Sequence, residues 1–212
     1  MRIVSVITAR GGSKGIPKKN ITDLNGNPLL YYSIMASVGS RVGKTFVSTD
    51  DKEISDIALN YRVSVIDRPK NLSNDIIMPD NALLHFAKMI DFDILVFIQP
   101  TSPMITSKYI NSGIDMLISN SYDSVFTATR EHWLPKWTTD VKPVDWDIHN
   151  RPRRQDKEDL YSENGMFYIT TRECLLSNSL RYGGKMGIVD IPLKDSFQVD
   201  TVADLELIRK II

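Results

Sequence analysis

The sequence has one cysteine and no long apolar run, and each shortage excludes a class of protein. Cys174 is the only cysteine in 212 residues, so the chain can form neither an internal disulfide nor a CxxC zinc site. No segment approaches the roughly 20 apolar residues of a membrane span, and the apolar stretch near the N-terminus is too short for a signal-peptide core. We therefore expect a cytoplasmic protein without a membrane partner, in which Cys174 is a small buried hydrophobe.

The sequence also lacks an excess of charge of either sign. Lys and Arg together number 26, as do Asp and Glu, so the formal net charge is zero. A neutral chain has no overall field that would attract nucleic acid or an anionic membrane, and we expect neither as a partner. Any anion site must therefore be built locally.

Short β-branched runs alternate with helix-length amphipathic segments over the first 130 residues. Such alternation is typical of a parallel sheet covered by helices. The sequence therefore predicts an α/β fold of Rossmann-like type, with a mainly parallel sheet flanked by helices, and its length suits a single domain over residues 1–212. Strands are predicted at residues 3–8, 45–48, 63–66, 94–98, 124–129, 165–171 and 185–191, and helices at residues 29–38, 51–60, 80–90, 107–118 and 201–212.

The pattern breaks at about residues 131–163. This segment holds all three tryptophans, Trp133, Trp137 and Trp146, which is too much apolar area for a solvated linker. Two interpretations remain open: an arm that packs against a second subunit, or a flap on its own core.

A glycine-rich basic loop follows the first predicted strand. Residues 9–20 hold three glycines and four cationic side chains, at the end of a parallel strand where open α/β sheets bind ligands. Glycines let backbone N–H groups approach an oxyanion, and the cations supply charge. The spacing fits neither a Walker A loop nor a dinucleotide fingerprint. The loop is predicted to hold phosphates, although a solvated basic loop is the alternative.

Six further motifs follow this loop in order, at residues 47–51, 68–75, 99–103, 154–155, 164–169 and 196–201. With the loop they resemble, along nearly the whole chain, the acylneuraminate cytidylyltransferases, which activate sialic acid and related nine-carbon acids. That resemblance implies a fold of the nucleotide-diphospho-sugar transferase type, a small excursion used for dimerisation, and a homodimer.

The resemblance implies the following roles at the nucleotide end of the site. Arg10, Lys14 and Lys19 would hold the triphosphate of CTP and act in catalysis. Arg68 would meet the cytosine acceptors with its planar fork of donors, unless it is a surface loop arginine. The implied nucleotide-binding set is Arg10, Gly11, Gly12, Ser13, Lys14, Lys19, Asn20 and Arg68.

At the sugar end, the resemblance implies that Gln99, Arg154 and Asn164 bind the nine-carbon sugar acid. Gln99 follows the most apolar strand of the chain and emerges beside the loop. Arg154 would reach over to the other subunit and pair with the carboxylate of the sugar bound there. Alternatively, residues 151–154 are a solvated basic run.

Asp200 precedes the last predicted helix, so it could be that helix's N-cap, a Mg²⁺ ligand, or both. The resemblance favours Mg²⁺ as cofactor. Related sequences commonly carry Asp-x-Asp here, whereas this chain has Gln198-x-Asp200. A second departure is Ser162-Glu163 before Asn164, where sialic acid enzymes often have Arg-Pro.

The expected reaction is transfer of CMP from CTP to the anomeric hydroxyl of a nonulosonic acid, with release of pyrophosphate. The two departures favour an acceptor such as legionaminic acid over ordinary sialic acid. The alternatives are a CMP-Kdo or other sugar nucleotidyltransferase and a non-catalytic nucleotide-binding homologue.

Overall fold

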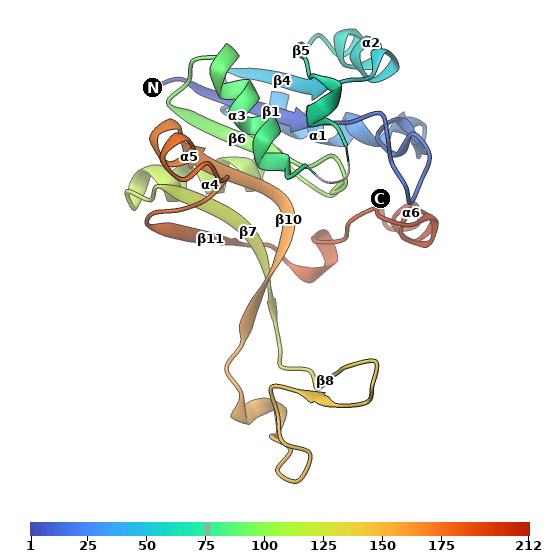
Figure 1. The fold of residues 1–212 in the computed structure, drawn as a ribbon, viewed down its shortest axis with the longest axis vertical. Coiled ribbons are helices and arrows are strands. Elements are labelled where there is room, and N and C mark those ends of the chain that lie inside the picture. The colour runs from blue at the N-terminus through green and yellow to red at the C-terminus, as the bar shows by residue number, and fades with distance from the viewer. Residues whose placement is uncertain (75–76) are drawn as a thin grey trace.

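The computed structural model describes residues 1–74 and 77–212, so Asp75 of the second motif lies outside the described part. Its centre is a seven-stranded sheet in the order β11-β7-β10-β6-β1-β4-β5 (Figure 1). β10 runs antiparallel to β6 and β7, and the other neighbours are parallel, which confirms the predicted mainly parallel fold. The strands are β1 Ile3–Thr8, β4 Lys44–Thr49, β5 Ser64–Asp67, β6 Ile94–Ile98, β7 Ser124–Glu131, β10 Leu160–Thr171 and β11 Met186–Asp190.

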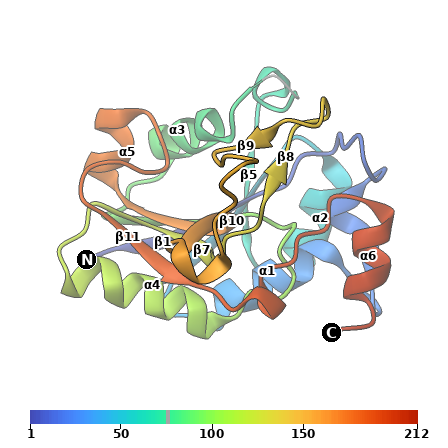
Figure 2. The ribbon, with the colours of Figure 1, turned by 90° about the horizontal axis from the view of Figure 1, so that it is seen from below.

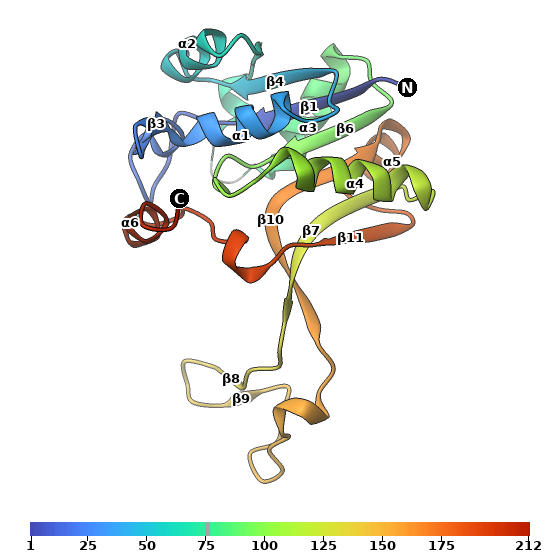
Figure 3. The same cartoon turned by 180° about the vertical axis from the view of Figure 1, so that it is seen from behind.

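Helices cover both faces of this sheet, so its central strands are largely apolar, although β1 also carries the buried Ser5. All five residues of β6 are buried. One core cluster joins the sheet to α1, α2 and α4, and a second joins the opposite face to α3 and α5 (Figures 2 and 3). The helices are α1 Leu29–Val38, α2 Lys52–Asn60, α3 Pro79–Met89, α4 Ser107–Ser119, α5 Arg172–Asn178 and α6 Val202–Ile208.

Among the described residues, none of these helices is long and apolar enough to cross a membrane. Cys174 is buried, as expected.

Several short elements were not expected from periodicity. α5 is one of them, and a small hairpin after the basic loop is another. Its turn places Asn25 and Gly26 at φ of 52° and 83°, the conformation that an Asn-Gly pair favours between two strands. The short elements are β2 Asp23–Leu24, β3 Asn27–Pro28, β8 Lys136–Trp137, β9 Pro143–Val144 and the 3₁₀ turns Lys19–Ile21, Lys70–Leu72, Arg154–Asp156 and Leu193–Asp195.

The last helix is shorter than predicted, and its cap is a different residue. The side chain of Thr201 accepts from the backbone N–H of Asp204, while the Asp204 carboxylate accepts from the backbone N–H of Thr201. This reciprocal pair is a capping box, and it holds the pKa of Asp204 below its usual range. The expectation that Asp200 caps this helix is therefore wrong.

β7 and β10 continue beyond the sheet into an arm that projects away from the body (Figure 1). The β8–β9 hairpin lies in this arm. Trp146 packs edge-on against Trp133 and Trp137, with ring centroids 6.3 and 4.9 Å away. Its indole N–H donates to the carbonyl of Lys136. The tryptophans thus form the arm's own small apolar cluster.

Candidate functional site

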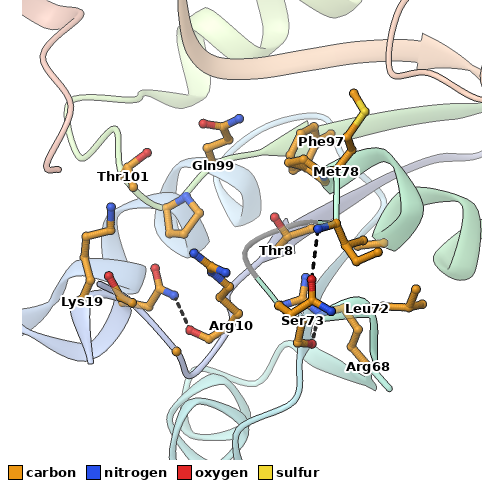
Figure 4. Close-up of a pocket in the computed structure, with 18 residues that line it drawn as sticks. Thr8, Arg10, Lys19, Arg68, Leu72, Ser73, Met78, Phe97, Gln99 and Thr101 are labelled. Carbon is orange, nitrogen blue, oxygen red and sulfur yellow. Dashed lines mark hydrogen bonds between the residues drawn. The ribbon is translucent and has the colours of Figure 1, made fainter. Parts of the chain in front are cut away.

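A cavity of about 330 Å³ lies at the carboxyl ends of the parallel strands. In Figure 4, Lys19, Arg10 and Gln99 are grouped on one side, and Leu72, Ser73 and Arg68 on the other. The loop after β1 and the turn after β6 meet there because β1 and β6 are neighbours in the sheet. Of the residues predicted to bind substrate, those that line the cavity are Arg10, Gly12, Ser13, Lys19, Asn20, Arg68 and Gln99.

The basic loop is fixed at both ends by hydrogen bonds. The N–H of Ala9 donates to the carbonyl of Ser48 on β4, and the buried amide of Asn20 donates to the carbonyl of Arg10 at 2.9 Å. Asp50 accepts from the N–H of Gly11 at 3.1 Å. Asn20 therefore braces the loop as well as lining the cavity.

Two glycines of the loop lie where a side chain would collide. A Cβ at Gly11 would sit 2.5 Å from Oδ2 and 2.8 Å from Cβ of Asp51, whose carboxylate caps α2. A Cβ at Gly15 would sit 2.5 Å from the backbone oxygen of Asp200. Gly12 has nothing within 4 Å of a Cβ. Two of the three glycines thus serve close packing of the loop.

Gly11→Ala is expected to destabilise the protein, because the new methyl group must displace the Asp51 carboxylate from the start of α2. Overpacking of this kind costs about 1–3 kcal/mol. The matched variant is Gly12→Ala, whose methyl group enters open space, and its thermal midpoint should equal that of the parent. Equal midpoints for the two variants, measured by calorimetry, would contradict this description of the loop.

Arg68 is a buried arginine, not the surface residue considered as the alternative; it is only 6% exposed. Its Nε donates to Ser73 Oγ at 3.0 Å, and its Nη2 lies 3.9 Å from Asp50 Oδ1. Nη2 is buried and donates no hydrogen bond to any residue in the described part of the chain. Burial lowers the pKa of Arg68, as does the nearby cation of Arg10, while Asp50 opposes that shift. The guanidinium groups of Arg10 and Arg68 both line this end of the cavity, which suits it to an electron-rich ligand.

Lys19 connects the loop to the last motif. Its Nζ lies 2.9 Å from Asp200 Oδ1, with the Lys19 side chain 16% exposed and that of Asp200 63% exposed. Asp200 is therefore at the edge of the cavity, beside a lining cation. Within residues 1–74 and 77–212, no group of three or more His, Cys, Asp and Glu side chains is placed to hold a metal. A metal at Asp200 would have one protein carboxylate, and this fits Mg²⁺ that also takes substrate oxygens and water.

Two of the three predicted sugar-end residues, Gln99 and Asn164, lie at a bulge in β10. Gly165 has a φ of +67°, and a Cβ there would sit 2.7 Å from Nε2 of Gln198 and 3.1 Å from Oε1 of Gln99. Gln198 Nε2 donates to the carbonyl of Asn164. An aspartate could not donate this bond, which gives a structural reason for Gln198. The Asn164 side chain bonds to Thr129 Oγ1 and to the Met166 N–H, so it shapes the bulge.

Some predicted residues lie apart from the cavity lining. Lys14 is exposed in the loop, and Gly11 lies against Asp51. Arg154 lies on the arm, in an open hollow with His132 and Asp159. Five further lining residues belong to the motifs at residues 68–75 and 99–103 but had no predicted role: Leu72, Ser73, Asn74, Pro100 and Thr101. Lining residues outside every predicted motif are Thr8, Ile77, Met78, Pro79, Ala82 and Phe97, three of them in or next to the start of α3.

Comparison with known families matches residues 4–210 to the model of a family described as Cytidylyltransferase. The chain belongs to the cytidylyltransferase family. Among this family's curated members, N-acylneuraminate cytidylyltransferase A of Danio rerio is 34% identical over 96% of this chain and 49% of that protein. Pseudaminic acid cytidylyltransferase of Campylobacter jejuni is 29% identical over 99% of this chain and 95% of that protein. The predicted family resemblance is confirmed.

This cytidylyltransferase chain spans about half the length of the first of these relatives. The solved structure of a CMP:2-keto-3-deoxy-manno-octonic acid synthetase complexed with CTP has the same fold. It shares 18% identity and a TM-score of 0.77 over 99% of this chain and 98% of that one.

Proposed function

We propose that this chain transfers CMP from CTP to the anomeric hydroxyl of a nonulosonic acid and releases pyrophosphate. The observation that carries the proposal is the convergence of Arg10, Lys19 and Arg68 on one cavity at the carboxyl edge of the sheet. Relatives named for N-acylneuraminate and pseudaminic acid support the acceptor class. A test is incubation with CTP, Mg²⁺ and a panel of sialic, legionaminic, pseudaminic and Kdo acids, with pyrophosphate as the readout.

The nucleotide end is assigned to Arg68 because a guanidinium only donates. Cytosine offers two adjacent acceptors, its O2 and N3, whereas uracil carries a hydrogen on N3. A buried Nη2 with no other bond in the described chain therefore suits CTP better than UTP. Ser73 holds the guanidinium through Nε, and Asp50 lies 3.9 Å from Nη2, too far for a hydrogen bond to it.

The reaction is an in-line displacement at the α-phosphorus of CTP. The anomeric hydroxyl gives up its proton to solvent as its oxygen forms the new bond to phosphorus. The bond from phosphorus to the bridging oxygen breaks, so that pyrophosphate leaves with the electron pair. Arg10 and Lys19 neutralise the charge that grows on the leaving group, and Lys14 adds a third cation from the same loop. Positioning and charge neutralisation supply most of the catalysis in such transfers.

We assign Asp200 as the protein ligand of Mg²⁺. When bound, the ion supplies positive charge beside phosphate oxygens. Asp200 suits this role because its carboxylate is largely exposed, lies beside Lys19 at the cavity edge and is not used as a helix cap. The ion pair with Lys19 orients that carboxylate.

Asp200→Asn is expected to weaken Mg²⁺ binding, because an amide is a poorer ligand than a carboxylate. At a fixed CTP concentration, about tenfold more Mg²⁺ should be needed for half of the thermal stabilisation given by nucleotide. Glu206→Gln on α6 removes a charge from an exposed residue and is the control. Identical Mg²⁺ titrations for Asp200→Asn and the parent would remove Asp200 as a ligand.

A second copy of the chain is proposed to complete the sugar site. Arg154 sits on the projecting arm, outside the cavity of its own chain. In the proposed dimer it would bind the carboxylate of a sugar held in the cavity of the partner subunit. The arm also exposes apolar side chains, with Leu134 66% and Ile148 55% exposed. A homodimer would cover part of that surface.

Legionaminic acid is the favoured acceptor within this class. The supporting features are the Ser162-Glu163 pair and Gln198, which stand where sialic acid enzymes commonly have other residues. CMP transfer to Kdo is the second candidate, supported only by the shared fold. Turnover with Kdo alone in the acceptor panel would favour it.

A further inference from the structure

The β10 bulge directs an acidic side chain toward Tyr168, whose ring packs on a residue of the cavity wall. Glu163 pairs with Ala128 of β7, and Tyr168 pairs with Phe126, so residues 164–167 face only Thr127. The extra residues turn the chain and bring the Glu163 carboxylate back onto the hydroxyl of Tyr168. Bulges commonly re-aim side chains next to active sites.

Tyr168 connects Glu163 to the cavity wall. Its ring stacks on Phe97, with centroids 5.5 Å apart and planes at 17°, and Phe97 lines the cavity. Burial raises the pKa of the Tyr168 hydroxyl, and the bond to Glu163 raises it further, so this group remains a donor. The other side of the bulge is Gly165, against Gln99. Glu163 is therefore connected to Phe97 of the cavity lining through Tyr168, and it stands two residues before Gly165, which lies against Gln99.

Arg181, the cation that lies next to Tyr168, is already paired with Asp80. Arg181 lies over the rings of Phe97 and Tyr168, at 5.4 and 4.9 Å from their centroids. Its guanidinium bonds to both oxygens of the buried Asp80, at 3.1 and 2.6 Å. No ion pair among the described residues involves Glu163. Within the same part of the chain, its side chain makes one hydrogen bond, which it accepts from the Tyr168 hydroxyl. Glu163 thus has acceptor capacity beyond its bond with Tyr168.

We propose that Glu163 determines acceptor specificity by accepting a hydrogen bond from an N–H group of the sugar. The inference rests on the proposed function and identifies the part of the substrate that this side chain binds. A carboxylate repels the acid group of the sugar, so it suits the opposite end of the molecule. It accepts strongly from an amide or a cationic nitrogen. The substrate class is a nonulosonic acid with acylamino or amidino groups, such as one bearing two acetamido groups.

The test compares three acceptors: a diacetamido nonulosonic acid, N-acetylneuraminic acid with one acetamido group, and its deaminated analogue with hydroxyls alone. The wild type should show the highest kcat/KM for the diacetamido acid and the lowest for the deaminated one. Glu163→Gln should reduce the ratio between these two by about tenfold, because the amide is a weaker acceptor. The KM for CTP should not change.

Tyr168→Phe provides a second variant, because it removes the hydroxyl that holds the carboxylate and leaves the ring on Phe97. It should lower the same ratio, by less than Glu163→Gln does. Glu173→Gln, on the exposed start of α5, is the matched control and should leave the ratio unchanged. If the wild type is active and Glu163→Gln shows the same ratio of kcat/KM between the two acceptors, the role of Glu163 is wrong while the proposed function stands. A wild type that turns over no nonulosonic acid overturns the proposed function and this inference together.

Discussion

Lys19→Ala is expected to lower kcat by about 100-fold or more, because it removes a cation from the wall of the cavity where pyrophosphate would leave. Loss of one preorganised group that stabilises transition-state charge has effects of this size. The Lys19–Asp200 pair is near the surface, so the fold should remain intact and the thermal midpoint should change little. Steady-state release of pyrophosphate measures the effect.

The neighbouring lysine is the control for this prediction. Lys18 pairs with Glu53 on α2, which raises the pKa of its ammonium group, and it does not line the cavity. Lys18→Ala removes the same charge one residue away and should keep nearly the parental kcat. Equal losses in the two variants would mean that overall loop charge matters, and the assigned role of Lys19 would be wrong.

Arg68→Lys is expected to raise the KM for CTP by about tenfold or more, although it keeps the positive charge. A lysine offers a point charge in place of the planar fork, so it cannot bond Ser73 and a base acceptor at once. The variant should also discriminate less between CTP and UTP. Isothermal titration with each nucleotide, without acceptor, measures both effects.

Arg62→Lys makes the same substitution at an exposed arginine between α2 and β5 and should bind CTP as the parent does. Unchanged CTP affinity in Arg68→Lys, with an intact fold, would remove Arg68 from the nucleotide site.

The meeting of the basic loop with Gln99 was predictable from sequence. Both follow apolar strand segments, and the carboxyl ends of parallel strands share one edge of a sheet. The order β6-β1-β4 then brings residues from distant parts of the chain to one cavity. Periodicity and strand direction were sufficient for that step.

Other features depended on contacts that no local pattern encodes. Met78 and Pro79 enter the cavity because α3 packs against β1, and the Glu163–Tyr168 bond exists because the register of β10 shifts at the bulge. Asp200 was misread as a cap, although Thr201 and Asp204 show the spacing of a capping box. The sequence thus contains the capping signal, but its first residue is Thr201 and not Asp200.

The most direct measurement of the central claim is the product of one reaction of the purified chain with CTP, Mg²⁺ and a diacetamido nonulosonic acid, followed by phosphorus NMR and mass spectrometry. The account predicts equal amounts of pyrophosphate and a CMP-sugar linked through the anomeric oxygen. Saturating CTP binding with no CMP-sugar from any nonulosonic acid would contradict it.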